Sequence, residues 1–165
     1  MLNERNAAKS RTRTRDAEDR FIEQMGLIMA ADGLPRIGGR LLALLLITED
    51  EVSLDDLARR LRVSKPSVST NARLLEQRGV IEKISRTADR RDYYRVADDV
   101  IGNTMQQRLL KLQRLQACVA GARGNFSASS TINRRLDNFA AACEHLGTLT
   151  ATALKKWNSV GKGAA

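Results

Sequence analysis

Two short helices joined by a tight turn are the sequence feature that most restricts the fold. Ser53 begins the first helix with a capping box, in which a hydroxyl at the N-cap is followed three positions later by an acidic residue. This helix ends near Arg62. Ser64 caps the next helix, Pro66 lies in its first turn and Gly79 ends it. Because so few residues separate the two helices, the sequence predicts a helix-turn-helix.

Two β-like segments follow the second of these helices directly. Residues 80–86 and 92–97 are rich in the β-branched and aromatic side chains that favour strands. The polar residues between them, 87–91, include two adjacent arginines and form the predicted loop of a hairpin. A hairpin placed immediately after a helix-turn-helix is the layout of a winged helix.

Further helices are expected before this unit. Apolar residues recur at helical spacing from Asp16 to about residue 32, and a second helix over 36–48 contains the longest apolar run, 41–47. This run is far shorter than the roughly 20 residues needed to cross a bilayer, so we expect it in the core. The adjacent Gly38 and Gly39 disfavour a helix and therefore indicate close approach of another backbone.

Two longer helices are predicted after residue 98. Apolar residues follow one side of the first at Ile101, Met105, Leu109, Leu112, Leu115 and Val119. After a Gly- and Ser-rich break, a heptad stripe comprises Ile132, Leu136, Phe139, Cys143, Leu146, Thr150, Ala153 and Trp157. A stripe this long must be buried against another helix, of the same chain or of a partner. The candidate dimerisation residues are Phe21, Ile101, Met105, Leu109, Leu112, Ile132, Leu136, Phe139, Cys143, Leu146 and Trp157.

The expected fold class is mostly α with a small β-hairpin wing. It is a winged helix-turn-helix flanked by N- and C-terminal dimerisation helices. The expected divisions are a disordered basic arm over 1–15, an N-terminal helix over 16–32, the winged domain over 33–97, two C-terminal helices over 98–157 and a disordered tail over 158–165.

The charge of the chain points to an anionic partner. Its 28 Lys and Arg residues outnumber its 19 Asp and Glu residues, which gives a formal charge of +9. A compact basic block over 53–97 coincides with the winged domain and is the expected electrostatic footprint on nucleic acid. The aromatic content of 4% argues against a stacking platform for single strands. A solvated surface is the alternative interpretation.

No arrangement of residues suggests catalysis or a metal. His145 is the single histidine, and both phosphate-loop motifs, GxGxxG and GxxxxGK[ST], are absent, so we expect neither an enzyme nor a cofactor. Cys118 and Cys143 make no disulfide framework and indicate a reducing compartment. We expect Cys143 to be a buried thiol, and a redox role for either cysteine stays open.

The N-terminal residues carry no sign of export. Residues 1–15 lack the apolar centre of a signal peptide, although their Arg- and Ser-rich composition is shared by organellar transit peptides. The expected location is the cytoplasm, without a membrane partner.

The second helix of the helix-turn-helix has a polar face suited to DNA. Opposite its apolar side lie Pro66, Ser69, Thr70, Arg73 and Gln77. Arginine and glutamine can read base edges in the major groove, and hydroxyls can also bond phosphates. We expect Arg73, Thr70 and Ser69 to read bases, with Gln77 as a further candidate. Lys65 is placed for a backbone contact. A solvated polar face is the alternative.

The hairpin loop has a second set of candidate residues. Arg90 and Arg91 lie at its tip, preceded by Arg86, and an arginine there can enter a narrow minor groove. Asp89 is the candidate to hold a neighbouring guanidinium in one orientation through a bidentate pair. The alternative is a plain surface loop with a weak ion pair.

Three segments carry a family resemblance: GLPRIGGRLLALLL, SLDDLARRLRVSKPSVSTNARLLEQRGVIEKI and DRRDYY. They resemble the winged helix-turn-helix of MarR-type bacterial transcriptional regulators, and more closely the GbsR-like branch. The resemblance implies a homodimer built from terminal helices, with two recognition helices in successive major grooves. It implies DNA-binding roles for Arg90, Arg91 and the whole segment Ser64–Arg73, which adds Ser64 and Ser67 to the residues above.

The expected function is a dimeric, sequence-specific DNA-binding regulator of transcription, with repression favoured over activation. A winged helix used for architecture or protein interaction is the alternative. Some GbsR-like proteins sense choline-type ligands, which usually need an aromatic cage. Both tyrosines fall in the hairpin, so that ligand is not carried over and an effector of unknown identity stays open.

Overall fold

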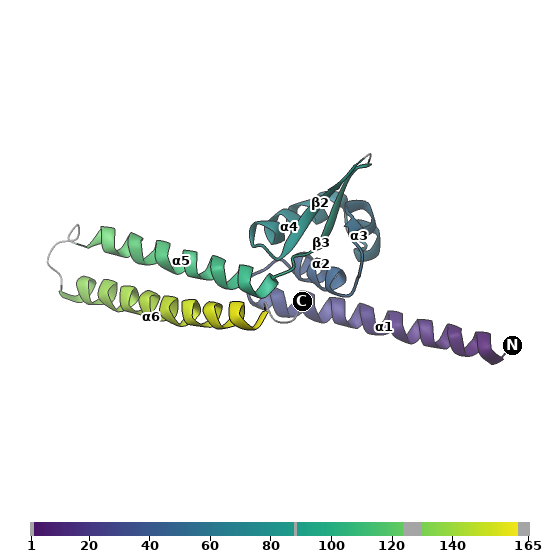
Figure 1. Ribbon diagram of the computed structural model, residues 1–165, viewed down its shortest axis with the longest axis horizontal. Coiled ribbons are helices and arrows are strands. Elements are labelled where there is room, and N and C mark those ends of the chain that lie inside the picture. Colours follow the sequence, from purple (N-terminus) through teal and green to yellow (C-terminus); the bar gives the residue numbers. More distant parts are fainter. Residues whose placement is uncertain (1, 88, 124–129, 162–165) are drawn as a thin grey trace. The chain divides into compact units, whose positions relative to one another are not determined.

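The computed structural model describes residues 2–87, 89–123 and 130–161, in two compact units that divide between Val100 and Ile101 (Figure 1). The first unit contains α1 (Leu2–Ala31), α2 (Arg36–Leu46), β1 (Val52–Ser53), α3 (Leu54–Leu61), α4 (Lys65–Gln77), β2 (Ile81–Arg86) and β3 (Asp89–Val96). The second unit is built from α5 (Val100–Ala122) and α6 (Ser130–Gly161). The mostly helical fold with a small antiparallel sheet is the expected winged helix.

The core of the first unit lies where α2, α3 and α4 meet the sheet. Apolar side chains from each of these elements are completely or almost completely buried there: Leu41, Leu44, Leu57, Leu61, Val68, Leu75 and Ile81. Residues 41–45 of the long apolar run are therefore core, as predicted, whereas Leu46 and Ile47 at its end are exposed. Burial of the apolar sides of α3 and α4 leaves their polar sides facing solvent.

Capping side chains determine where the two helices of the helix-turn-helix begin. The Ser53 hydroxyl accepts a hydrogen bond from the Asp56 backbone N–H at 3.1 Å and donates one to the Asp56 carboxylate at 2.7 Å. The Ser64 hydroxyl accepts a bond from the Ser67 N–H. Arg62 ends α3 in the left-handed conformation with φ 56°, and Gly79 follows α4 with φ 67°. The predicted boundaries of both helices are confirmed.

The sheet has one more strand than the sequence predicted. Its order is β1-β3-β2 and both pairings are antiparallel, so β3 is the central strand. The extra strand β1 is only two residues long and pairs Val52 with Tyr94 and Ser53 with Tyr93. The prediction that residues 87–91 form a loop was also wrong, because β3 already begins at Asp89 and pairs it with Arg86.

Helices α1 and α2 approach closely at two glycines. A Cβ atom at Gly39 would lie 2.8 Å from the backbone oxygen of Met25 and 3.0 Å from Cα of Gly26. The prediction of close backbone approach is confirmed at this crossing. Glu23 of α1 also forms ion pairs with Arg36 and Arg40 of α2, at 2.6 and 2.8 Å.

Both ends of the chain are more helical than the expected disordered segments. Helix α1 begins at Leu2, so the segment 1–15 is helical from there onward. Its alanines, arginines and lysine favour a helix, and no Gly or Pro interrupts it before Gly26. Helix α6 continues to Gly161, and residues 162–165 of the expected tail lie outside the described part of the chain.

The heptad stripe of α6 divides between two faces of the helix. Cys143 is buried and Leu136 is half-buried, on the side that packs along α5. Large apolar residues on the neighbouring side remain exposed in the single chain: Ile132, Phe139, Leu146, Leu149 and Trp157. The stripe therefore runs along the edge between a face that is covered within the chain and a face that is uncovered in the single chain. Burial of the uncovered face against a partner stays a prediction.

Candidate nucleic-acid interface

The recognition helix α4 has the two faces that its sequence predicts. Val68, Ala72 and Leu75 are buried against the core. On the other side Pro66, Thr70, Arg73 and Gln77 are exposed, and Ser69 is half-buried. The only acidic residue of this helix, Glu76, is exposed near its C-terminal end. Most of the face therefore presents hydroxyls and long donor side chains to solvent.

The first turn of α4 combines capping with charge. The exposed Ser64 is its cap, and the half-buried Ser67 supplies the N–H that this cap accepts. Lys65 is exposed and forms an ion pair of 2.8 Å with Asp55 of α3. Exposed pairs of this kind are weak, so the lysine can exchange its partner for a phosphate.

Asn71 is a buried polar residue that the sequence analysis did not single out. Its Nδ2 donates to the Ser67 carbonyl at 2.8 Å, and its Oδ1 has no hydrogen-bond partner among the described residues. A Cβ atom at Gly38 would lie 3.2 Å from that Oδ1. Gly38, the first of the two glycines of α2, therefore leaves the space in which Asn71 brings α4 against α2.

The wing holds Arg91 in one orientation through Asp89. The Arg91 Nε donates to both carboxylate oxygens of Asp89, at 3.0 and 3.1 Å, and Nη2 donates to Oδ2 at 2.6 Å. The Arg91 backbone N–H also donates to Oδ1, and the Tyr93 hydroxyl donates to Oδ2 at 2.7 Å. The geometry is the bidentate pair that the sequence predicted for Asp89.

These hydrogen bonds shift the pKa values of Asp89 and Tyr93 in opposite directions. Hydrogen bonds from the Arg91 side chain and backbone, and then from Tyr93, hold the pKa of Asp89 well below its ordinary value. The bond to Asp89, with burial in addition, raises the pKa of the Tyr93 hydroxyl. Tyr93 therefore keeps the proton that it donates, and Asp89 stays ionised as the acceptor, across the neutral pH range.

The other two wing arginines have different surroundings. Arg86 donates from Nε and Nη2 to the Glu51 carboxylate, at 3.1 and 2.6 Å, and its guanidinium carbon lies 4.0 Å from the centre of the Tyr93 ring. Arg90 is exposed and forms no ion pair with the residues that the structure describes. Glu51 and Tyr93 were missed by the sequence analysis, because nothing local to either residue shows its partner.

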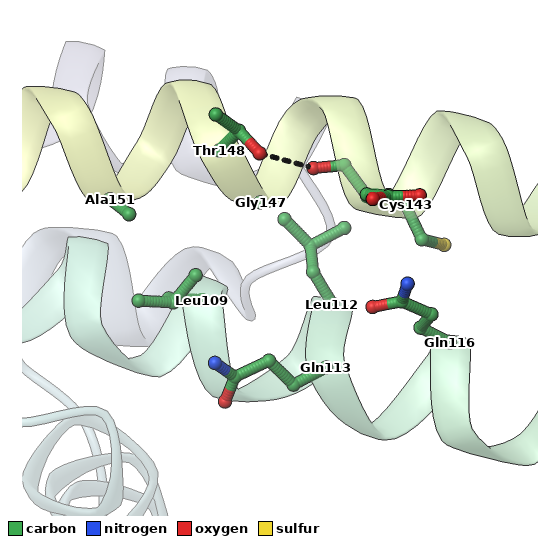
Figure 2. A pocket seen from close by; sticks show the side chains of 9 residues that line it. Leu109, Leu112, Gln113, Gln116, Cys143, Gly147, Thr148 and Ala151 are labelled. Atoms are coloured by element: carbon green, nitrogen blue, oxygen red, sulfur yellow. Dashed lines mark hydrogen bonds between the residues drawn. The ribbon is translucent and has the colours of Figure 1, made fainter.

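A groove lies between α5 and α6 within the second unit (Figure 2). Its volume is about 310 Å³, and it is lined by Leu109, Leu112, Gln113, Gln116, Cys143, Glu144, Gly147, Thr148 and Ala151. Gly147 keeps it open, since the nearest neighbour of a Cβ there would be Leu109 at 3.9 Å. Cys143 is buried, as predicted, whereas Cys118 is exposed.

The described residues offer no group of three or more His, Cys, Asp or Glu side chains that could hold a metal ion. None of the helices in the described ranges is both long and apolar enough to cross a membrane.

Comparisons with known proteins agree with this architecture. A model of the MarR family matches residues 32–92. The chain is 32% identical over 140 residues to the HTH-type transcriptional regulator MmpR5 of Mycobacterium tuberculosis, and the match covers 84% of this chain and 85% of that protein. A crystal structure of a transcriptional regulator is similar with a TM-score of 0.80 and 30% identity, covering 87% of this chain and 99% of that one. From these matches and its winged-helix fold, the chain belongs to the MarR family of transcriptional regulators.

Proposed function

We propose that this protein is a dimeric regulator of transcription that binds specific double-stranded DNA sequences. The observation that carries the proposal is the exposed face of α4, where Arg73, Thr70 and Gln77 point away from a fully packed core. Side chains of these types read base edges in a major groove. Membership of a family of transcriptional regulators supports the same conclusion.

The wing supplies the second contact of the proposed complex. Its exposed arginines, Arg90 and Arg91, belong to the end of the hairpin and enter a minor groove in the proposal, where the negative potential attracts guanidinium groups. Lys65 and the hydroxyls of the first turn of α4 contact the phosphate backbone between the two grooves.

A dimer of this protein acts as a repressor in the proposal, because a bound dimer occludes promoter DNA. The uncovered apolar side of α6 supports dimerisation, since a monomer rarely leaves so many large apolar side chains exposed. The motif resemblance described above supports placement in the GbsR-like branch.

Selection of bound sequences from random duplex DNA tests the function. A recovered palindrome with half-sites about one helical turn apart, roughly 34 Å, is expected for two recognition helices related by a twofold axis. Binding that is uniform across sequences and strongly salt-dependent would instead assign the protein an architectural role.

Arg73→Ala is expected to weaken binding to the selected site by about 1–3 kcal/mol and to relax the preference at one base position. The reason is the loss of a bidentate contact to a base edge. Sequence selection repeated with the variant measures the effect. Arg114→Ala, an exposed position on α5, is the control and leaves the preferred sequence unchanged. An unaltered preference in Arg73→Ala removes this residue from base reading.

Arg90→Ala is expected to reduce the salt dependence of binding by about one unit of the log–log slope, because each neutralised phosphate contributes about 0.9. Arg90 is exposed and has no ion pair in the described part of the chain, so its removal breaks no ion pair there. Titrations at several salt concentrations measure the slope. An unchanged slope and affinity would show that Arg90 does not meet the DNA backbone.

A further inference from the structure

Tyr93 occupies an unusual position between the sheet and the tip of the wing. It lies on the central strand β3, where it pairs with Ser53 of β1 on one side and with Ile84 of β2 on the other. Only 5% of its surface is exposed. The backbone of this residue is therefore held on both sides, which fixes the position from which its side chain extends.

The hydroxyl of Tyr93 connects this anchored position to the exposed wing. It donates to Asp89 Oδ2 at 2.7 Å, the same oxygen that accepts the bond of 2.6 Å from Arg91 Nη2. The carboxylate is thus hydrogen-bonded both to the buried Tyr93 and to the exposed Arg91. Because Tyr93 restrains Asp89, it also restrains the guanidinium that Asp89 holds.

The ring of Tyr93 restrains the arginines in a second way. The guanidinium carbons of Arg86 and Arg91 lie 4.0 and 5.4 Å from its centre, within the range of cation–π attraction. Arg86 is tied in addition to Glu51, which precedes β1. Leucine would supply neither the hydroxyl nor the ring, and phenylalanine would supply only the ring.

We propose that Tyr93 is a positioning residue for DNA binding, which holds Arg91 through Asp89 and Arg86 through its ring before the wing meets DNA. The inference rests on the proposed function. An arginine that is already ordered loses less conformational freedom on binding, so the restraint raises affinity without Tyr93 itself touching DNA.

Two substitutions separate the hydroxyl from the ring. Tyr93→Phe removes only the bond to Asp89, whereas Tyr93→Leu also removes the surface beneath the arginines. Tyr94→Phe is the matched control, because Tyr94 is the next residue on the same strand, is 3% exposed and has no arginine above its ring in the described part of the chain.

The first measurement is made on the free protein. The Nε–H groups of Arg86 and Arg91 are observed by NMR, and their exchange with solvent reports whether each guanidinium is held. In Tyr93→Phe the Arg91 signal is expected to exchange faster and the Arg86 signal to be retained. In Tyr93→Leu both are expected to exchange faster, and in Tyr94→Phe neither changes.

The second measurement is affinity for the DNA sequence selected with the wild type. Tyr93→Phe is expected to bind about threefold to tenfold more weakly, as for the loss of one hydrogen bond, and Tyr93→Leu more weakly still. Backbone amide spectra confirm that each variant is folded. A merely structural role would lower thermal stability without changing the arginine signals.

The outcomes separate this inference from the proposed function. Equal affinities of the wild type and Tyr93→Phe, an unchanged Arg91 signal, or the same loss in Tyr94→Phe would each overturn the positioning role. A wild type that binds no duplex overturns the proposed function, and the arginine signals alone then decide whether Tyr93 holds the two side chains.

Discussion

Gly39→Val is expected to separate α1 from α2 and to lower the free energy of unfolding by about 3 kcal/mol or more, at the upper end of the range for overpacked sites. The new Cβ would lie 2.8 Å from the Met25 backbone oxygen and 2.8 Å from the Met29 Cβ. A backbone oxygen cannot rotate away as a flexible side-chain end does, so one helix must shift. Ile22 of α1 belongs to the hydrophobic core of the first unit, so a shift of α1 is expected to expose it.

Urea denaturation of the full-length protein measures the change. Gly121→Val is the matched control, since a Cβ at Gly121 on α5 would have no neighbour within 4 Å. The control is expected to differ little from the wild type, because valine has a higher helix propensity than glycine. Equal midpoints for the two variants would show that the crossing of α1 and α2 tolerates a side chain at Gly39.

The elements of the winged domain with local signals could be predicted from the sequence. Ser53 and Ser64 predict where two helices begin, because a capping hydroxyl accepts a hydrogen bond from a backbone N–H only three residues away. The adjacent glycines of α2 predict a close helix crossing from a similarly local signal. They disfavour the helix that contains them, so their presence indicates that another backbone approaches closely.

The elements that the sequence did not reveal depend on distant partners. Strand β1 has no alternation to detect in its two residues and exists because β3 offers a free edge. Glu51 forms hydrogen bonds with Arg86, which lies 35 positions away in the sequence. The role of Tyr93 depends on its contacts with both Asp89 and Arg86. Asn71 was missed for the same reason, because the space that it occupies is supplied by Gly38.

Helix α6 shows a different limit of sequence patterns. At about 100° per residue, the covered residues Leu136 and Cys143 and the exposed residues Phe139 and Leu146 lie on neighbouring sides of the helix. A heptad pattern joins the two sides into one stripe, because it records which residues are apolar and not which helix covers them. The uncovered side is therefore visible only after α5 is in place.

Leu146→Asp is expected to dissociate the proposed dimer and to abolish binding to a DNA site with two half-sites. Leu146 is 42% exposed in the single chain, in the middle of the uncovered side between Phe139 and Trp157. A carboxylate at this position has water around it in a monomer and therefore costs little there. In a dimer interface it would be buried without a partner, at a cost of several kcal/mol.

Sedimentation of the wild type and the variant at micromolar concentration measures the change, and circular dichroism shows whether the variant keeps its helices. Ala141→Asp is the matched control: it adds the same charge to an exposed position on the opposite side of α6. The control is expected to remain dimeric and to bind DNA as the wild type does. Because one recognition helix and one wing contact only a half-site, a wild type that is monomeric and still binds tightly would remove dimerisation from the proposed mechanism. If Leu146→Asp and Ala141→Asp both remain dimeric, the two chains meet through a surface other than the exposed side of α6.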